Sequence, residues 1–342
     1  MTISQARPLL SPEEIAVRAG QQVPHLHMPA RSDVFSARET RLRQHAASHA
    51  MQDFLVFASE VAHAQHLSLQ AYPAVALPDA KALDAARDTA QAPLPAALWP
   101  RDPLWRTALR SMLDNLLPRL ANNPAQAVVL ELQQMSDQEM ELQADRLLNN
   151  IMFGLNLATA PLIAAGLQVY WTHMLLATVA ARGDDKLAPF GRIGDSTRCP
   201  CCGSLPTASV SRVDGEGNYR YLHCSLCSLQ WHMVRIKCSH CEGTKGIHYH
   251  SLQAADAADA DAASGNTVSK AAIEVETCDE CNHYLKIVRM ERDIASEPVA
   301  DDLSSVILDL LISEAGYQRH GVNLLLLFGD PEVAGSDDGG GG

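Results

Sequence analysis

The sequence predicts an α+β protein, in which an N-terminal all-α helical domain is followed by two small rubredoxin-like or zinc-ribbon β modules and a C-terminal helix. Three observations favour this fold class. Apolar residues recur at helical spacing through about the first 190 residues. All nine cysteines lie between Cys199 and Cys281, and eight of them form four Cys-x-x-Cys pairs. Short alternating and aromatic runs, which are typical of strands, flank these pairs.

Capping residues and apolar spacing predict the helices of the first domain. Residues 11–14 read Ser-Pro-Glu-Glu, a capping box with proline at the first helical position. A long helical segment is expected over residues 38–66, and Pro124 can start a later helix. Residues 136–139 form a second capping box. The helix before Pro118 has a clear apolar stripe, made of Trp105, Leu109, Met112, Leu113 and Leu116.

Two stretches of this domain differ in composition from the rest of it. Residues 71–100 are rich in alanine and proline, and we expect an exposed connection with at most a short helix over residues 81–87. Residues 147–181 contain no formally charged residue, but Pro161 and Gly166 divide the run. We therefore expect two buried helices rather than a membrane span, over residues 147–159 and 162–182.

The β modules and the C-terminal region complete the predicted order. The runs expected as strands are residues 219–223, 229–236, 247–250, 273–276 and 284–288. Residues 254–270 carry little apolar bulk and are expected to be a disordered loop. A last helix should run from Asp301 or Asp302 to about Ala315, with an apolar face of Leu303, Ile307, Leu310 and Leu311. The predicted division is a helical domain over 1–190, four-cysteine metal modules over 191–236 and 237–293, the C-terminal helix packing back over 294–330, and a flexible tail over 331–342.

The four Cys-x-x-Cys pairs can build two tetrathiolate metal sites. Each turn presents two sulfurs to one ion, and two turns close the tetrahedron that Zn²⁺ or a rubredoxin-type iron prefers. A disulfide framework is the alternative, but disulfide-rich chains are usually short and cross-linked throughout, whereas no cysteine precedes Cys199. The predicted metal ligands are Cys199, Cys202, Cys224, Cys227, Cys238, Cys241, Cys278 and Cys281.

Sequential pairing of these turns is the economical arrangement. An interleaved alternative would thread the short segment from Cys227 to Cys238 between both sites. Cys201 is then left over and is expected to be a small spectator. Histidines near the turns are expected in structural or surface roles: His223, His232, His240, His248, His250 and His283. Basic residues there either offset thiolate charge or are solvated strand residues: Arg198, Arg220, Arg235, Lys237 and Lys245.

Composition limits the function classes. The net charge of −13 argues against a general nucleic-acid binder, because phosphate affinity comes mainly from lysine and arginine. The first residues lack the basic start and apolar run of an export signal, so free cysteines predict a reducing, cytoplasmic setting. In the helical half no nucleophile and base can be paired from spacing, so we do not expect an enzyme.

The cysteine region resembles a known family. Its motifs are Arg-Cys-Pro-Cys-Cys-Gly-Ser at residues 198–204, Tyr-Leu-His-Cys-Ser-Leu-Cys at 221–227, Lys-Cys-Ser-His-Cys at 237–241 and Glu-Thr-Cys-Asp-Glu-Cys at 276–281. Together with Leu-Gln-Val-Tyr-Trp at 167–171, they resemble the formate dehydrogenase accessory protein family FdhE. The resemblance is strong over the C-terminal half and looser before it.

This resemblance implies a cytoplasmic assembly factor that is required for active respiratory formate dehydrogenase and that contacts its catalytic subunit. It also implies two iron ions bound in rubredoxin-like fashion, with zinc as the alternative occupant, and all eight paired cysteines match ligand positions. Departures from the family pattern are Cys201, Asn282 where glycine is common, and the insertion at residues 254–270. None removes a ligand.

The sequence is compatible with three functions. The preferred hypothesis is a non-catalytic accessory protein, because closed four-sulfur sites leave no open coordination position for substrate. The first alternative is a rubredoxin-like electron carrier, since a tetrathiolate iron can change oxidation state. The second is a zinc-ribbon protein that binds nucleic acid, which the acidic balance disfavours.

Overall fold

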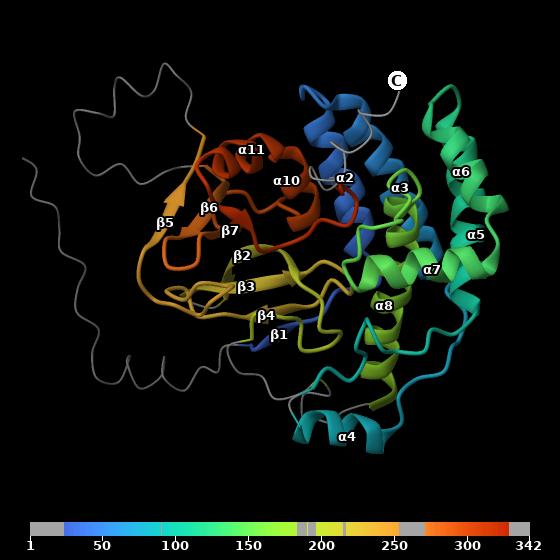
Figure 1. Cartoon of the computed structure of the whole chain (residues 1–342), viewed down its shortest axis with the longest axis horizontal. Helices are drawn as coiled ribbons and strands as arrows, with labels where there is room; N and C mark the ends of the chain where they lie inside the picture. The colour runs from blue at the N-terminus through green and yellow to red at the C-terminus, as the bar shows by residue number, and fades with distance from the viewer. Residues whose placement is uncertain are drawn as a thin grey trace, which may run out of the picture.

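A computed structural model describes residues 24–89, 91–182, 190, 196–214, 217–252 and 271–327. Figure 1 shows the N-terminal helices on one side of the molecule, a twisted sheet on the other, and two C-terminal helices over one face of the sheet. The predicted α+β class is confirmed. The expected capping box at residues 11–14, the loop 254–270 and the tail 331–342 lie outside the described residues.

The helices of the N-terminal part follow the predicted order. Their bounds are α2 Val34–Ala46, α3 Gln52–Gln70, α4 Ala80–Asp88, α5 Leu104–Leu116, the 3₁₀ turn η1 Leu117–Leu120, α6 Ala125–Gln134, α7 Asp137–Leu148 and α8 Ala160–Arg182. All five residues of the stripe predicted before Pro118 are buried on α5. The Ser136 side chain accepts the Glu139 N–H at 3.1 Å, which confirms this N-cap.

Two predicted helices are wrong in their extent. The segment 38–66 is two helices, because the His49 imidazole accepts the Met51 N–H at 3.0 Å and so competes with the helical hydrogen bonds there. The helix expected over 147–159 does not form, because α7 ends at Leu148 and residues 149–159 are turns and irregular backbone. Asn150 and Gly154 take positive φ angles of 56° and 70°, a left-handed conformation that cannot continue an α-helix.

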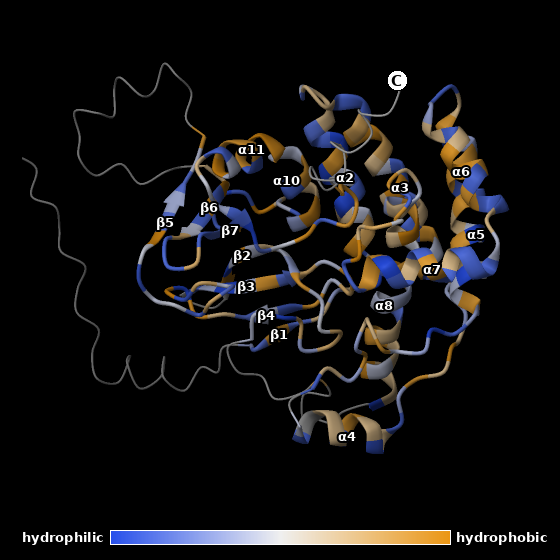
Figure 2. Ribbon diagram, in the orientation of Figure 1, coloured by the Kyte–Doolittle hydropathy of each residue, from blue (hydrophilic) through white to orange (hydrophobic). Residues whose placement is uncertain are grey.

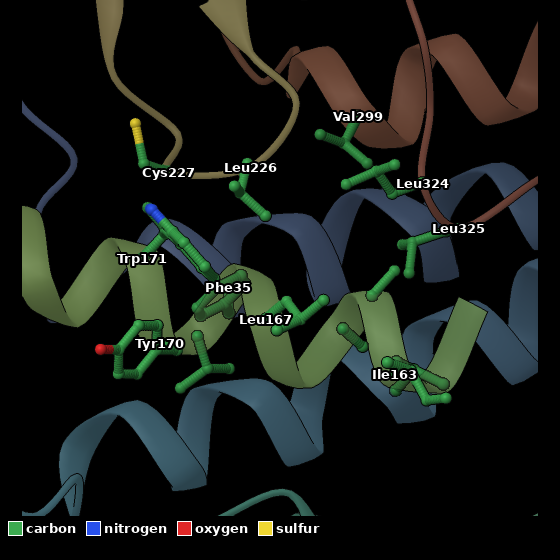
Figure 3. Packing of buried hydrophobic residues seen from close by; sticks show 14 of the residues in the cluster. Phe35, Ile163, Leu167, Tyr170, Trp171, Leu226, Cys227, Val299, Leu324 and Leu325 are labelled. Carbon is green, nitrogen blue, oxygen red and sulfur yellow. The ribbon is translucent and has the colours of Figure 1, made fainter. Parts of the chain in front are cut away.

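Helix α8 is the centre of the hydrophobic core. It is long and apolar enough to cross a membrane, but 83% of its apolar window is buried inside the protein, as in a core helix. Figure 3 shows Leu167 and Trp171 of α8 beside Phe35, and Ile163 further along the same helix; all four belong to one hydrophobic core. The connection before α5 is less exposed than predicted, since Leu94 is fully buried and its carbonyl accepts the Trp171 indole N–H at 3.1 Å.

A buried histidine on α8 gives the fold a measurable pH dependence. His173 is 8% exposed, packs against the Tyr72 ring and accepts a hydrogen bond at 3.2 Å from Arg31. Burial, assisted by the Arg31 charge, lowers the pKa of His173 to about 4. The unfolded chain takes up this proton near pH 6.5, so the free energy of unfolding should fall by up to about 3 kcal/mol as the pH drops from 6.5 to 4.

Denaturant titrations at pH 7.5, 5.5 and 4.5 measure this effect. A His173→Gln variant should lose less stability than the unmodified protein across the same interval, because its side chain takes up no proton there. Parallel pH profiles for the two proteins would contradict the assignment.

Both cysteine modules contribute to one eight-stranded sheet. Its order is β1-β4-β3-β2-β7-β6-β5, with β8 paired to β7. The strands are β1 Leu26–His27, β2 Pro206–Asp214, β3 Gly217–Cys224, β4 Gln230–His232, β5 Ile247–His250, β6 Ile273–Cys278, β7 His283–Arg289 and β8 Gln318–Arg319. Four of the five runs predicted as strands lie in β3, β5, β6 and β7, whereas the run 229–236 is a strand only over Gln230–His232. Strands β1, β2 and β8 were not predicted. The parallel pairing of β2 with β7 joins the two modules.

A buried ion pair strengthens this junction. Arg220 on β3 is 1% exposed and donates to Glu276 on β6 at 2.7 Å, to Ser209 at 3.0 Å and to the Lys237 carbonyl at 2.7 Å. Removing one member of such a pair leaves a buried charge without its partner, which commonly costs about 3–5 kcal/mol. Arg220 is therefore not a solvated strand residue; it ties the first module to the second.

The C-terminal region contains two helices, α10 Pro298–Ser304 and α11 Val306–Glu314, rather than the single helix predicted. Buried Lys286 on β7 donates to the Asp302 carbonyl at 2.7 Å, an oxygen that the next helical turn would use. The same ammonium lies 2.6 Å from the Asp309 carboxylate, and this ion pair turns the Asp309 side of α11 toward the sheet. The predicted apolar face is therefore turned: Leu308 and Ile312 are buried, whereas the expected Ile307, Leu310 and Leu311 are exposed.

Helix α10 packs on β2 and β7 of the sheet, and a second cation completes the buried charge network beneath it. Arg319 lies 2.7 Å from Asp302 and 3.1 Å from Asp309, so two carboxylates face two cations. Burial alone would raise the pKa of Asp302, but Arg319 and Lys286 hold it below its usual range. In the hydropathy view of Figure 2, α11 retains apolar residues along its length.

Candidate metal centres

The structure gathers the eight paired cysteines into two clusters of four. The first centre contains Cys199, Cys202, Cys224 and Cys227, and the second contains Cys238, Cys241, Cys278 and Cys281; within each, the sulfurs lie within 4.8 Å of one another. This grouping is the one that sequential pairing of the turns predicts.

The spacing of the sulfurs fits a tetrahedral ion. In the first centre, Cys199 Sγ lies 3.5 Å from Cys227 Sγ, and Cys202 Sγ lies 3.4 Å from Cys224 Sγ. The corresponding cross-pairs of the second centre are 3.7 and 3.8 Å apart. A metal–sulfur distance of about 2.3 Å gives a tetrahedron with edges of about 3.8 Å. The donor set and the distances both fit Zn²⁺ or iron, and neither distinguishes between them.

Each cysteine turn is built by the same backbone geometry. The residue after the second cysteine has a positive φ in all four turns: 73° at Gly203, 59° at Ser228, 60° at Glu242 and 54° at Asn282. Asn282, which departs from the family pattern, thus adopts a left-handed conformation that asparagine tolerates better than most residues. Backbone N–H groups also point at the sulfurs, as from Cys227 to Cys224 and from Gly243 to Cys241, both at 3.4 Å. Such donors stabilise thiolates.

The thiol pKa values of the first centre favour a bound cation. Burial raises the pKa of Cys199 and of Cys227 well above the usual range. Burial would also raise that of Cys202, but hydrogen bonds from neighbouring thiols and Ser204 hold it well below that range. One thiolate in this pocket therefore makes the next less favourable. A divalent cation removes this conflict, because its charge stabilises several thiolates together.

The two centres differ in their surroundings. All four cysteines of the first centre are at most 2% exposed and belong to the same hydrophobic core as α8. In Figure 3, Cys227 and Leu226 lie directly above Trp171 and Leu167. In the second centre, Cys241 is exposed and Cys281 is partly exposed. The first centre is thus part of the core, and the second lies at the surface.

The helical part positions the first centre through backbone hydrogen bonds. Leu94 and Ala96 donate to the carbonyls of Cys201 and Cys202 at 3.0 and 2.9 Å. From α8, Gln168 donates to the Ser225 carbonyl at 2.8 Å, while its own oxygen accepts from Gln65 at 2.9 Å. Gln168 is buried, and its partners are distant in sequence, so spacing alone could not reveal them.

Two groups beside the centres do not join them as ligands in this geometry. Cys201 is fully buried outside the first four-sulfur cluster. His240 and His283 lie near Cys281, but their rings are stacked 3.7 Å apart and 8° from parallel. Lone pairs lie in the ring planes, so two parallel stacked imidazoles cannot converge on one ion without turning. The spectator role of Cys201 and the structural roles of the histidines stay predictions.

The comparisons with known proteins come from sequence and from structure. Three family models match the chain in succession. The model described as "FdhE, N-terminal" matches residues 23–187, the one described as "FdhE, central domain" matches residues 198–235, and the one described as "FdhE, C-terminal domain" matches residues 236–326. The chain belongs to the FdhE family. Protein FdhE of Salmonella dublin is 36% identical to this chain over 317 residues, which covers 92% of this chain and 95% of the relative. An FdhE homolog of Cronobacter sakazakii is 35% identical over the same shares.

A solved FdhE structure has the same fold. The crystal structure of the FdhE protein from Pseudomonas aeruginosa matches with a TM-score of 0.74 and 36% identity, and the match covers 90% of this chain and 100% of that one. The resemblance seen in the cysteine motifs is confirmed, and it extends through the helical part. The two four-cysteine clusters can each hold a metal ion.

Proposed function

We propose that this protein is a cytoplasmic assembly factor for respiratory formate dehydrogenase and that it binds the catalytic subunit through or beside its four-cysteine centres. The eight cysteines of the two clusters are the ligands, with one iron ion in each centre and zinc as the alternative occupant. The observation that best supports this function is the pair of closed four-sulfur clusters in a chain of the FdhE family. Four protein ligands leave no open position on an ion for substrate chemistry, which favours a binding role.

An electron carrier is the second candidate, and one observation favours it. The second centre has an exposed cysteine, Cys241, so a redox partner could approach its sulfur closely. Reversible bleaching of the visible absorption by reductant, coupled to turnover with formate dehydrogenase, would support this role. A nucleic-acid role is disfavoured by the net charge of −13.

Anaerobic co-purification tests the proposed function. A tagged formate dehydrogenase catalytic subunit should retain this protein in stoichiometric amount, and retention should fall when Cys238 and Cys241 are both replaced by serine. Metal analysis of the same preparation distinguishes iron from zinc. No retention above that of the serine variant would contradict the proposal.

A further inference from the structure

A pocket lies where the helical part, the first centre and the C-terminal segment meet. Its volume is about 180 Å³. The lining comes from five separate stretches of the chain and includes Leu98, Leu147, Leu148, Cys202, Leu226 and Leu324. A cavity of about 150 Å³ lined by apolar groups holds a molecule the size of benzene. This pocket therefore has room for one apolar side chain.

Leu98 presents an apolar surface at the mouth of this pocket. Its side chain is 82% exposed, an unusual state for leucine, although the backbone around it is fixed. The N–H groups of Leu98 and Trp99 both donate to the Pro95 carbonyl, at 3.0 and 2.8 Å. The N–H group of Ala96 donates to the Cys202 carbonyl in the first centre. A rigid turn that holds a leucine in solvent loses little entropy when a partner covers it.

The charge at the mouth specifies the kind of occupant. Among the described residues that line the pocket, Arg198 is the one basic side chain. One of its terminal nitrogens donates to the Gly203 carbonyl at 3.2 Å, and the side chain is exposed, so the guanidinium keeps donors for a further acceptor. The net charge of this chain is −13, so the Arg198 guanidinium is a local positive charge on an acidic protein. A partner that places an apolar side chain in the pocket and a carboxylate beside Arg198 would complement both features.

We propose that this pocket is the docking site for an extended segment of the unfinished catalytic subunit, with one apolar side chain in the pocket and an acidic residue against Arg198. The inference rests on the proposed function and adds the binding surface to it. Cys202 lines the pocket although it is 1% exposed, so the bound side chain lies beside a residue of the first centre. Docking is thereby coupled to an intact first centre, because the Cys202 turn forms part of the wall.

Binding measurements on the full-length, metal-loaded protein test the site. The probe is the purified catalytic subunit, immobilised under anaerobic conditions. Leu98→Asp should weaken binding at least about tenfold, because it removes the apolar mouth and repels the carboxylate. Leu98→Lys should weaken binding less than Leu98→Asp, and Leu98→Met should stay within about twofold of the unmodified protein. Phe153→Asp is the matched control, since Phe153 is 84% exposed but does not line the pocket.

The outcomes separate the two proposals. Equal affinity of the Leu98→Asp and Phe153→Asp variants overturns the docking site and leaves the proposed function standing. No binding by the unmodified protein overturns both. A dimer that Leu98→Asp converts to monomer, with subunit binding unchanged, identifies a second copy of this chain as the occupant and also overturns the docking site. Protection of residues 94–99 and 198–205 from hydrogen exchange by the subunit supports it.

Discussion

Replacing Cys227 by serine is expected to remove the metal from the first centre and to unfold the helical part together with it. Cys227 is fully buried and belongs to the core cluster that contains Trp171 and Leu167 of α8. A structural tetrathiolate ion contributes on the order of 10 kcal/mol to folding, and whole proteins are stable by only about 5–15 kcal/mol. Loss of one ligand should therefore lower the free energy of unfolding by about 5 kcal/mol or more.

Metal analysis and circular dichroism measure this outcome. The metal content should fall from about two ions per chain to about one, and the helical signal should be lost at a much lower temperature. Cys201→Ala is the matched control, because Cys201 is equally buried and one residue from a ligand, but lies outside the four-sulfur cluster. That variant should keep its full metal content. If the Cys227→Ser protein retained its metal and its helical stability, the first centre would have no structural role.

The sequence was sufficient to predict both centres because Cys-x-x-Cys spacing is local. A turn of four residues places two sulfurs together whatever surrounds it, and only the pairing of turns needed a topological argument. Helices with strong local signals were also predictable, as for the α5 stripe and the Ser136 cap. Strand β2 was missed because most of its buried residues are small or polar: Ala208, Ser209 and Ser211 are fully buried, and Val210 between them gives little apolar alternation by itself.

Features that depend on distant partners could not be predicted. The helix break at Ser305 and the turned face of α11 follow from Lys286, which lies on a strand of the sheet. The parallel pairing of β2 with β7, which makes one sheet of two modules, has no local signature. Likewise, Leu98 looked like part of an ordinary exposed connection. Its position beside the first centre depends on the hydrogen bonds from Leu94 and Ala96 to the cysteine turn.

The second centre is expected to release its metal much faster than the first when a strong chelator is added. A chelator must reach the ion or a transiently freed thiolate, and Cys241 is exposed while Cys281 is partly exposed. The sulfurs of the first centre become accessible only when the core around α8 opens, which requires sub-global unfolding. The two phases should therefore differ in rate by at least about a hundredfold, since each 1.4 kcal/mol of opening free energy gives a factor of about ten.

Stopped-flow release with a chromogenic chelator, followed by hydrogen exchange, measures this difference and its structural effect. After the fast phase, exchange should increase in β5 and β6, which border the second centre at the sheet edge, and should remain slow in α8. A Cys241→Ser variant should lack the fast phase and keep the slow one. A single phase that releases both ions, or increased exchange in α8 during the fast phase, would mean that the centres form one cooperative unit. In that case the surface position of the second centre would have no kinetic consequence.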